Sequence, residues 1–146
     1  MITCDTSFLY SLYIVDVHTT RARARLSRIR RADALALSPF HEYELPNAIR
    51  LSVFRSLRDA TTGNAILAAF EADLAVGLFE RPTCNLASVL QEAKRLSSIY
   101  TANGGHRALD ILHVAAALHL GATEFLSFDQ NQRKLAVAAG LTIGPT

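Results

Sequence analysis

Short apolar runs alternate with longer, helix-like segments along the whole chain, and this alternation constrains the fold most strongly. The short runs have the length and composition of buried strands. The predicted strands are residues 2–5, 33–38, 78–80, 124–128 and 141–143. The predicted helices span about residues 7–30, 39–57, 61–76, 85–101, 107–120 and 130–139. Strands separated by helices predict an α/β fold, with a central, mostly parallel sheet of about five strands flanked by helices.

Local signals mark several helix boundaries. Ser38 and Pro39 supply an N-cap and a first-turn proline for the second predicted helix. Pro46, inside that helix, predicts a kink or a later start. The segment at residues 107–120 is apolar nearly all round, so we expect that helix to be buried.

The composition limits the class of protein. A chain of 146 residues, half of them hydrophobic, is expected to fold as a single domain over residues 1–146. Its apolar stretches are interrupted too often for a membrane span, and the early acid at position 5 argues against a secretory signal. Cys4 and Cys84 lack metal or redox spacing, so we expect a cytoplasmic protein with Cys4 in its core.

Four acidic residues lie beside the apolar runs: Asp5, Glu44, Asp110 and Asp129. Carboxylates next to core segments are costly unless they are paired or bound to a metal. Asp5 and Asp129 follow predicted strands, and the carboxyl ends of parallel strands form the ligand-binding edge of such a sheet. Asp110 opens the buried helix, and Glu44 lies on the helix after the second strand. We therefore expect all four in one pocket.

A cluster of carboxylates suits Mg²⁺, with Mn²⁺ as a substitute. One or two such ions would remove the mutual repulsion that otherwise raises the pKa of each acid. A site of this kind activates water and stabilises the leaving oxyanion of a phosphodiester. The hydroxyls of Thr6 and Ser7 are candidates to position a phosphate or a metal-bound water. Arg107 is a candidate to contact phosphate or to hold a carboxylate.

Each acid also has a structural interpretation, as a helix cap or a surface charge. For Asp129, which precedes a helix, capping is a strong competitor. His106, Asp110 and His113 share one helical face and offer a transition-metal set, although the HExxH spacing of a metalloprotease is absent. His113 is more simply explained as a packed, hydrogen-bonded helix residue.

An arginine-rich segment is the second chemical feature. Six arginines fall between Arg21 and Arg31, and the planar guanidinium suits phosphate better than the ammonium group of lysine does. The alternative is a solvated helix face, with Leu26 and Ile29 turned toward the core. The sequence leaves both interpretations open.

Four sequence blocks carry a family resemblance. They are Ile2–Ser7; Ser38–His41 with Glu44–Leu45 and Asn47–Ala48; Arg107–Ala117; and Phe125–Asp129 with Gln132–Ala136. In these blocks the chain resembles the PIN-domain ribonucleases, and specifically the VapC toxins of type II toxin–antitoxin pairs. The blocks occur in the order of the family and span almost the whole chain, and the third and fourth at this spacing are the most specific.

The resemblance implies a PIN-like domain in which Asp5, Glu44, Asp110 and Asp129 form the catalytic metal site. Asp5 and Asp110 would be the closest metal ligands, and Asp129 would also bind the metal. It also implies a homodimer and inhibition by a cognate antitoxin. Pro46 departs from the family pattern, which makes Glu42 the alternative to Glu44.

We therefore expect a Mg²⁺-dependent endoribonuclease, the toxin of a toxin–antitoxin pair, that hydrolyses RNA phosphodiesters with metal-activated water. The alternatives are a stand-alone RNA-processing nuclease and a catalytically silent PIN-fold binding module. The Arg21–Arg31 segment is expected to contact RNA or antitoxin. The apolar helices at residues 47–75 are expected to offer a surface for a second copy and for an antitoxin helix. The residues behind that expectation are Ile49, Val53, Leu57, Ile66, Leu67, Phe70 and Leu74.

Overall fold

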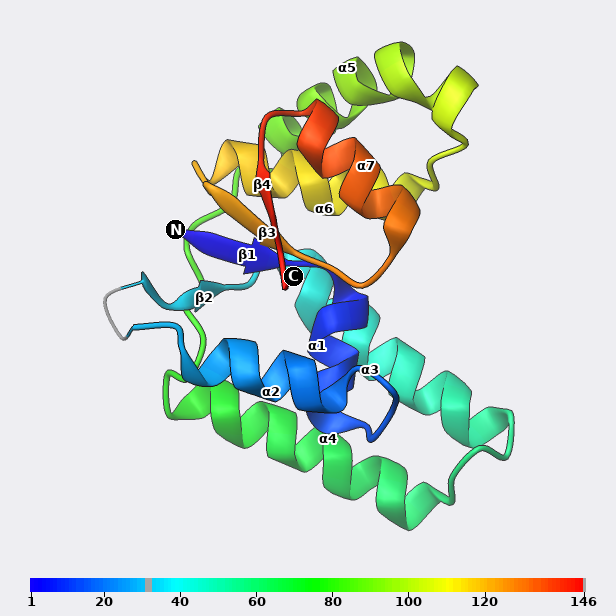
Figure 1. The fold of residues 1–146 in the computed structure, drawn as a ribbon. Coiled ribbons are helices and arrows are strands. Elements are labelled where there is room, and N and C mark those ends of the chain that lie inside the picture. Colours follow the sequence, from blue (N-terminus) through cyan, green and yellow to red (C-terminus); the bar gives the residue numbers. More distant parts are fainter. Residues whose placement is uncertain (31–32, 146) are drawn as a thin grey trace.

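A computed structural model describes residues 1–30 and 33–145 (Figure 1). The strands in these residues are β1 (Ile2–Cys4), β2 (Leu35–Ala36), β3 (Glu124–Leu126) and β4 (Thr142–Gly144). The helices are α1 (Thr6–Tyr13), α2 (Thr19–Ser27), α3 (Pro39–Phe54), α4 (Ala60–Ala75), α5 (Leu86–Gly104), α6 (Ala108–His119) and α7 (Gln130–Ala138). The predicted α/β fold is confirmed.

The described strands form one parallel sheet in the order β2-β1-β3-β4. Cys4 at the end of β1 pairs with Leu126 at the end of β3, and the backbone N–H of Asp5 donates to the Leu126 carbonyl at 2.9 Å. Because the two strands run in the same direction, the residues that follow them leave the sheet at one edge. The register therefore places Asp5 beside the segment that carries Asp129.

The predicted strand at residues 78–80 is wrong in extent. Only one bridge, between Ala36 and Glu80, joins that segment to β2. The Leu37 N–H donates to the Glu80 carbonyl at 2.8 Å, and the Glu80 N–H donates to the Leu35 carbonyl at 3.0 Å. Pro82 lacks an N–H and follows at once, so pairing does not extend along the segment.

The predicted helix at residues 7–30 is wrong, because the chain breaks after α1 and restarts as α2. Asp16 makes the break, since its side chain accepts hydrogen bonds from the Ser11 hydroxyl at 2.7 Å and the His18 N–H at 2.8 Å. The Asp16 N–H in turn donates to the Thr19 hydroxyl at 2.8 Å. Such local side-chain bonds compete with helical bonds. Of the arginine-rich segment, Arg31 lies outside the described residues.

Helices cover both faces of the sheet and enclose two apolar clusters. In Figure 1, α1 to α4 lie on one side of the sheet and α5, α6 and α7 on the other. Leu126 packs into the first cluster with Phe8 and Phe70, whereas its neighbour Phe125 packs into the second with Leu96. The burial of α6 is as predicted, and Leu26 and Ile29 of the arginine segment pack against the first cluster. None of the helices in the described part is long and apolar enough to cross a membrane.

Helix α3 begins at Pro39 and runs through Pro46, so the expected late start is not found. His41, in its first turn, ties this helix to β1. The Ser38 N–H donates to His41 Nδ1 at 3.0 Å, so Nε2 carries the proton and donates to the Cys4 carbonyl at 2.9 Å. Burial, together with the nearby His113, lowers the pKa of His41 to about 3.

The neutral state of His41 makes the fold sensitive to acid. Below its ordinary pKa of 6.5 this residue takes up a proton in the unfolded chain but not in the folded one, until the pH approaches about 3. Within that window the free energy of unfolding should fall as the pH falls, by up to about 1.4 kcal/mol per pH unit from His41 alone. In NMR, the Cε1–H signal that disappears in His41→Gln should not titrate between about pH 8 and about pH 4. A midpoint near the ordinary value would contradict the buried, neutral assignment.

Candidate functional site

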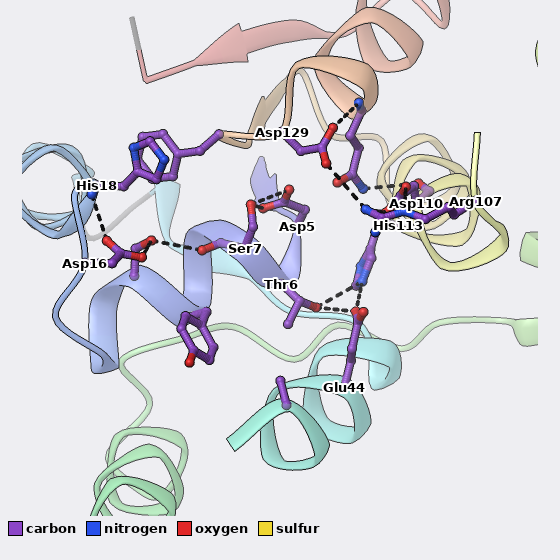
Figure 2. A pocket seen from close by; sticks show the side chains of 15 residues that line it. Asp5, Thr6, Ser7, Asp16, His18, Glu44, Arg107, Asp110, His113 and Asp129 are labelled. Carbon is purple, nitrogen blue, oxygen red and sulfur yellow. Dashed lines mark hydrogen bonds and ion pairs between the residues drawn. The ribbon is translucent and has the colours of Figure 1, made fainter. Parts of the chain in front are cut away.

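A polar pocket of about 420 Å³ opens at the carboxyl edge of the sheet (Figure 2). Its walls come from the β1–α1 junction, α3, the start of α6, the β3–α7 junction and the loop between α1 and α2. The residues around it are Asp5, Thr6, Ser7, Tyr10, Ser11, Asp16, His18, Glu44, Ala48, Arg107, Asp110, His113, Phe128, Asp129 and Gln132. The pocket thus draws on segments from both ends of the chain.

Asp5 is the buried acid at the floor of the pocket. It is the N-cap of α1, and its carboxylate accepts hydrogen bonds from the Phe8 N–H at 2.7 Å and from the Ser127 hydroxyl at 2.5 Å. The Ser7 hydroxyl donates to both carboxylate oxygens, at 2.8 and 2.7 Å. Burial raises the pKa of Asp5, and these hydrogen bonds offset part of the rise. Asp5 is therefore a fixed carboxylate whose donors favour its charged form.

Asp110 and Asp129 share one cationic partner, Arg107. The guanidinium binds Asp110 through Nε at 2.8 Å and Nη2 at 3.2 Å, and it reaches Asp129 through Nη2 at 3.4 Å. Asp129 also caps α7, accepting from the N–H groups of Asn131 at 2.8 Å and Gln132 at 3.0 Å. The Arg107 side chain is 74% exposed, so most of its surface remains open to solvent. Its charge offsets the repulsion between the two carboxylates.

Glu44, on α3, is held by side chains from α6 and α1. His113 Nε2 donates to Glu44 Oε2 at 2.6 Å, and the Thr6 hydroxyl donates to the same oxygen at 2.5 Å. Burial alone would raise the pKa of Glu44, but the hydrogen bonds from His113 and Thr6 outweigh it and hold that pKa below its ordinary value. Glu44 is therefore ionised near neutral pH.

The four acids offer oxygen donors, which is the chemistry that Mg²⁺ prefers. Within the described residues, however, no three His, Cys, Asp or Glu side chains are placed as ligands of one metal ion. Each acid is engaged by protein donors instead. The donor set therefore fits a hard divalent cation, while Arg107 holds two of its members in the present arrangement.

The structure brings the predicted site residues together around this pocket. Asp5, Glu44, Asp110 and Asp129 all line it, as do Thr6, Ser7 and Arg107. Their catalytic and binding roles remain predictions. Glu42, the alternative to Glu44, does not line the pocket and lies 3.6 Å from Arg81.

The alternative transition-metal set is not assembled. His106 precedes α6 rather than lying on it, Asp110 binds Arg107, and His113 binds Glu44. His113 is the packed, hydrogen-bonded residue that the sequence suggested, with 2% of its side chain exposed.

Sequence reasoning missed the contact of His113 with Glu44 and the place of Asp16, His18 and Phe128 at the rim. His113 lies one turn after Asp110 on α6, and that spacing was a usable signal. Asp16 and His18 were assigned to a continuous helix, so their position in a loop at the pocket was not predicted. Phe128 directly precedes Asp129 and was counted as a strand residue.

Comparison with known proteins agrees with the fold. A sequence model of the PIN domain matches residues 2–138. The chain belongs to the PIN domain family. No curated protein sequence matches the chain.

Several solved structures share the fold of this PIN domain. FitAcB from Neisseria gonorrhoeae aligns with a TM-score of 0.72 at 18% identity, over 99% of this chain and 97% of that one. VapC20 from Mycobacterium tuberculosis aligns with a TM-score of 0.70 at 16% identity, over 99% and 100%. VapBC-1 from nontypeable Haemophilus influenzae aligns with a TM-score of 0.66 at 17% identity, over 99% and 97%. At these identities the likeness establishes the fold.

Two substitutions separate the role of Asp129 as the cap of α7 from its place among the acids of the pocket. Asp129→Asn keeps the acceptor oxygen, so α7 should remain capped and the free energy of unfolding should stay within about 0.5 kcal/mol of the parent. Asp129→Ala removes the cap and should lower that free energy by about 1 kcal/mol. Urea denaturation measures both values. Equal stabilities for the two variants would show that capping by Asp129 contributes nothing.

Proposed function

We propose that this PIN domain is a Mg²⁺-dependent endoribonuclease and the toxin component of a toxin–antitoxin pair. The observation that carries the proposal is the meeting of four carboxylates, from four separated segments, in one pocket at the carboxyl edge of the sheet. A packed fold accommodates such a cluster at an electrostatic cost, so a shared function explains it better than four unrelated structural roles.

Asp5, Asp110 and Asp129 are the residues that would hold the cation. When bound, Mg²⁺ supplies a water of lowered pKa and a positive charge next to the scissile phosphate. Glu44, kept ionised by His113 and Thr6, is the acceptor for a proton in the same pocket. The exposed guanidinium of Arg107 is a charge-assisted donor suited to a phosphate oxygen of the RNA.

Structural neighbours support the substrate class. VapC20 is described as a toxin that cleaves the sarcin–ricin loop, and it aligns along its whole length with this chain. RNA cleavage by the present PIN domain is inferred from that likeness and from the pocket's acids. Which RNA it cleaves depends on surfaces outside the acid cluster.

A cognate antitoxin and a homodimer belong to the same proposal. The apolar surface that we expected on residues 47–75 is smaller than predicted, because Ile49, Phe70 and Leu74 are buried in the core. Phe54 is 83% exposed and Leu57 is 69% exposed, so the apolar surface gathers at the end of α3. A partner helix or a second copy is expected to cover that end.

One observation favours the catalytically silent alternative. Arg107 already balances the charges of Asp110 and Asp129, which is what a binding module without a metal would need. A stand-alone RNA-processing nuclease would keep the same pocket chemistry and lack only the antitoxin. Cleavage assays decide the first alternative, and co-purification with an antitoxin decides the second.

Cleavage should depend on a divalent cation and on Asp110. Purified protein should cleave structured RNA in Mg²⁺ or Mn²⁺ and stop when excess chelator is added. Asp110→Asn is nearly isosteric and should lower the cleavage rate by about a hundredfold or more, as expected when an electrostatic contact to the transition state is lost.

The matched control is Glu92→Gln on α5, which changes the charge of a partly exposed acid that pairs with Arg95 outside the pocket. It should leave cleavage unchanged. Circular dichroism should show that both variants are folded. Full activity in chelator, or in folded Asp110→Asn, would contradict the metal-dependent mechanism.

A further inference from the structure

A stack of three rings stands at the rim of the acid pocket. Phe8 is buried in the core and lies against Phe128, with ring centres 5.7 Å apart and planes 24° apart. His18 lies against Phe128 at 4.2 Å, with planes only 7° apart. The middle ring, Phe128, and the outer ring, His18, are partly exposed and line the pocket. The stack therefore runs from the core to the pocket wall.

The stack is held in place before any ligand binds. Phe128 sits between β3 and Asp129, so its position follows from the sheet register. The backbone of His18 is fixed by Asp16, which also accepts from the Ser11 hydroxyl of α1. In Figure 2, His18 and Arg107 lie on opposite sides of the pocket, with Asp5 between them. A planar ring is thus presented near the acids at little ordering cost.

Positive charge continues outward from the stack along α2. The Arg21 guanidinium carbon lies 5.5 Å from the centre of the Phe128 ring. Arg21 also lines a second cavity of about 370 Å³, together with Arg25 and Arg28, so it lies between that cavity and the Phe128 ring at the rim of the acid pocket. Glu124 neutralises Arg25 at 2.5 Å. Arg21 and Arg28 are exposed and have no acidic partner within the part of the chain that the structure describes.

We propose that His18 is a stacking platform for one base of a single-stranded RNA, and that Arg21 and Arg28 bind the phosphates beside that base. The proposal rests on the nuclease function above and names the form of substrate that reaches its pocket. An aromatic face next to a track of arginines is the usual arrangement for unpaired nucleic acid, because every base has a face that stacks and every linkage carries a charge. An acidic protein segment would satisfy the arginines but would leave the stacked ring without a matching group.

The test measures RNA binding without cleavage. Fluorescence anisotropy in chelator follows labelled single-stranded oligouridylate on the parent, on His18→Ala and on His18→Tyr. Loss of the ring in His18→Ala should weaken binding about fivefold or more, while His18→Tyr keeps a ring and should bind within about twofold of the parent. Thermal melting establishes that each variant is folded, and the tyrosine variant keeps the test decisive if the alanine variant does not fold.

An RNA oligonucleotide with one abasic position identifies the base that stacks on His18. In the parent, one such position should weaken binding about as much as His18→Ala does, and the same abasic strand should cause no further loss in His18→Ala. Additive losses would mean that the base and His18 do not touch, which overturns the proposal.

The arginines are tested by salt dependence. Arg21→Gln and Arg28→Gln should each reduce the slope of log affinity against log salt by about 0.7. Arg95→Gln, on α5 and outside both cavities, is the matched control and should leave the slope unchanged. Unchanged slopes in the first two variants would mean that Arg21 and Arg28 do not contact RNA and that α2 presents a solvated helix face.

The possible failures are distinguishable. If His18→Ala and both arginine variants bind RNA as the parent does while the parent still cleaves RNA, the stacking site is wrong and the nuclease function stands. If the variants lose binding of polyglutamate but not of RNA, the surface belongs to a protein partner and the proposal is overturned. If the parent binds no RNA in chelator, the stacking site is also overturned, whatever the cleavage assay shows.

Discussion

The parallel pairing of β1 with β3 is the constraint on which the rest of the site depends. It joins residues near the two ends of the chain, so that Asp5 after β1 and Ser127 to Asp129 after β3 leave the sheet side by side. The hydrogen bond from the Ser127 hydroxyl to Asp5 is a direct product of that register. A shift by one residue would turn Phe125 and Leu126 to the wrong faces and separate the two acids. The fold and the pocket are therefore stabilised by the same pairing.

The second requirement is that four carboxylates coexist in a small space. The protein meets it with a set of donors at each acid: a backbone N–H and hydroxyls at Asp5, backbone N–H groups at Asp129, a guanidinium at Asp110, and a histidine with a hydroxyl at Glu44. Three of these are buried or built into helix starts. Arg107 is the exception, because its side chain is mostly exposed. A cation entering the pocket would therefore have to compete chiefly with Arg107.

Much of this could be predicted from the sequence. Apolar periodicity gave the alternation of strands and helices, and the acids at the ends of those segments pointed to a common edge. Periodicity could not show the break at Asp16, because that break comes from side-chain hydrogen bonds to Ser11 and the His18 backbone within a segment of helical composition. The His18–Phe128 stack was hidden by the same error.

The choice between Glu42 and Glu44 also lay beyond the sequence. Both residues lie near the start of α3, but of the two only Glu44 lines the pocket, where it contacts His113, far away in the chain on α6. Arg107 shows the same limit, since the sequence offered phosphate or carboxylate as its partner and the structure places it on Asp110 and Asp129. Local patterns identify the chemistry that is available, whereas partners are set by packing between distant segments.

The central proposal is that these acids bind divalent cations in competition with Arg107. Calorimetric titration of the protein with Mn²⁺ tests this most directly, because it needs neither RNA nor turnover. Arg107→Gln should bind Mn²⁺ more tightly than the parent, since a competing positive charge is removed from Asp110 and Asp129. Asp110→Asn should bind it more weakly. Weaker binding in Arg107→Gln, or unchanged binding in Asp110→Asn, would contradict the account.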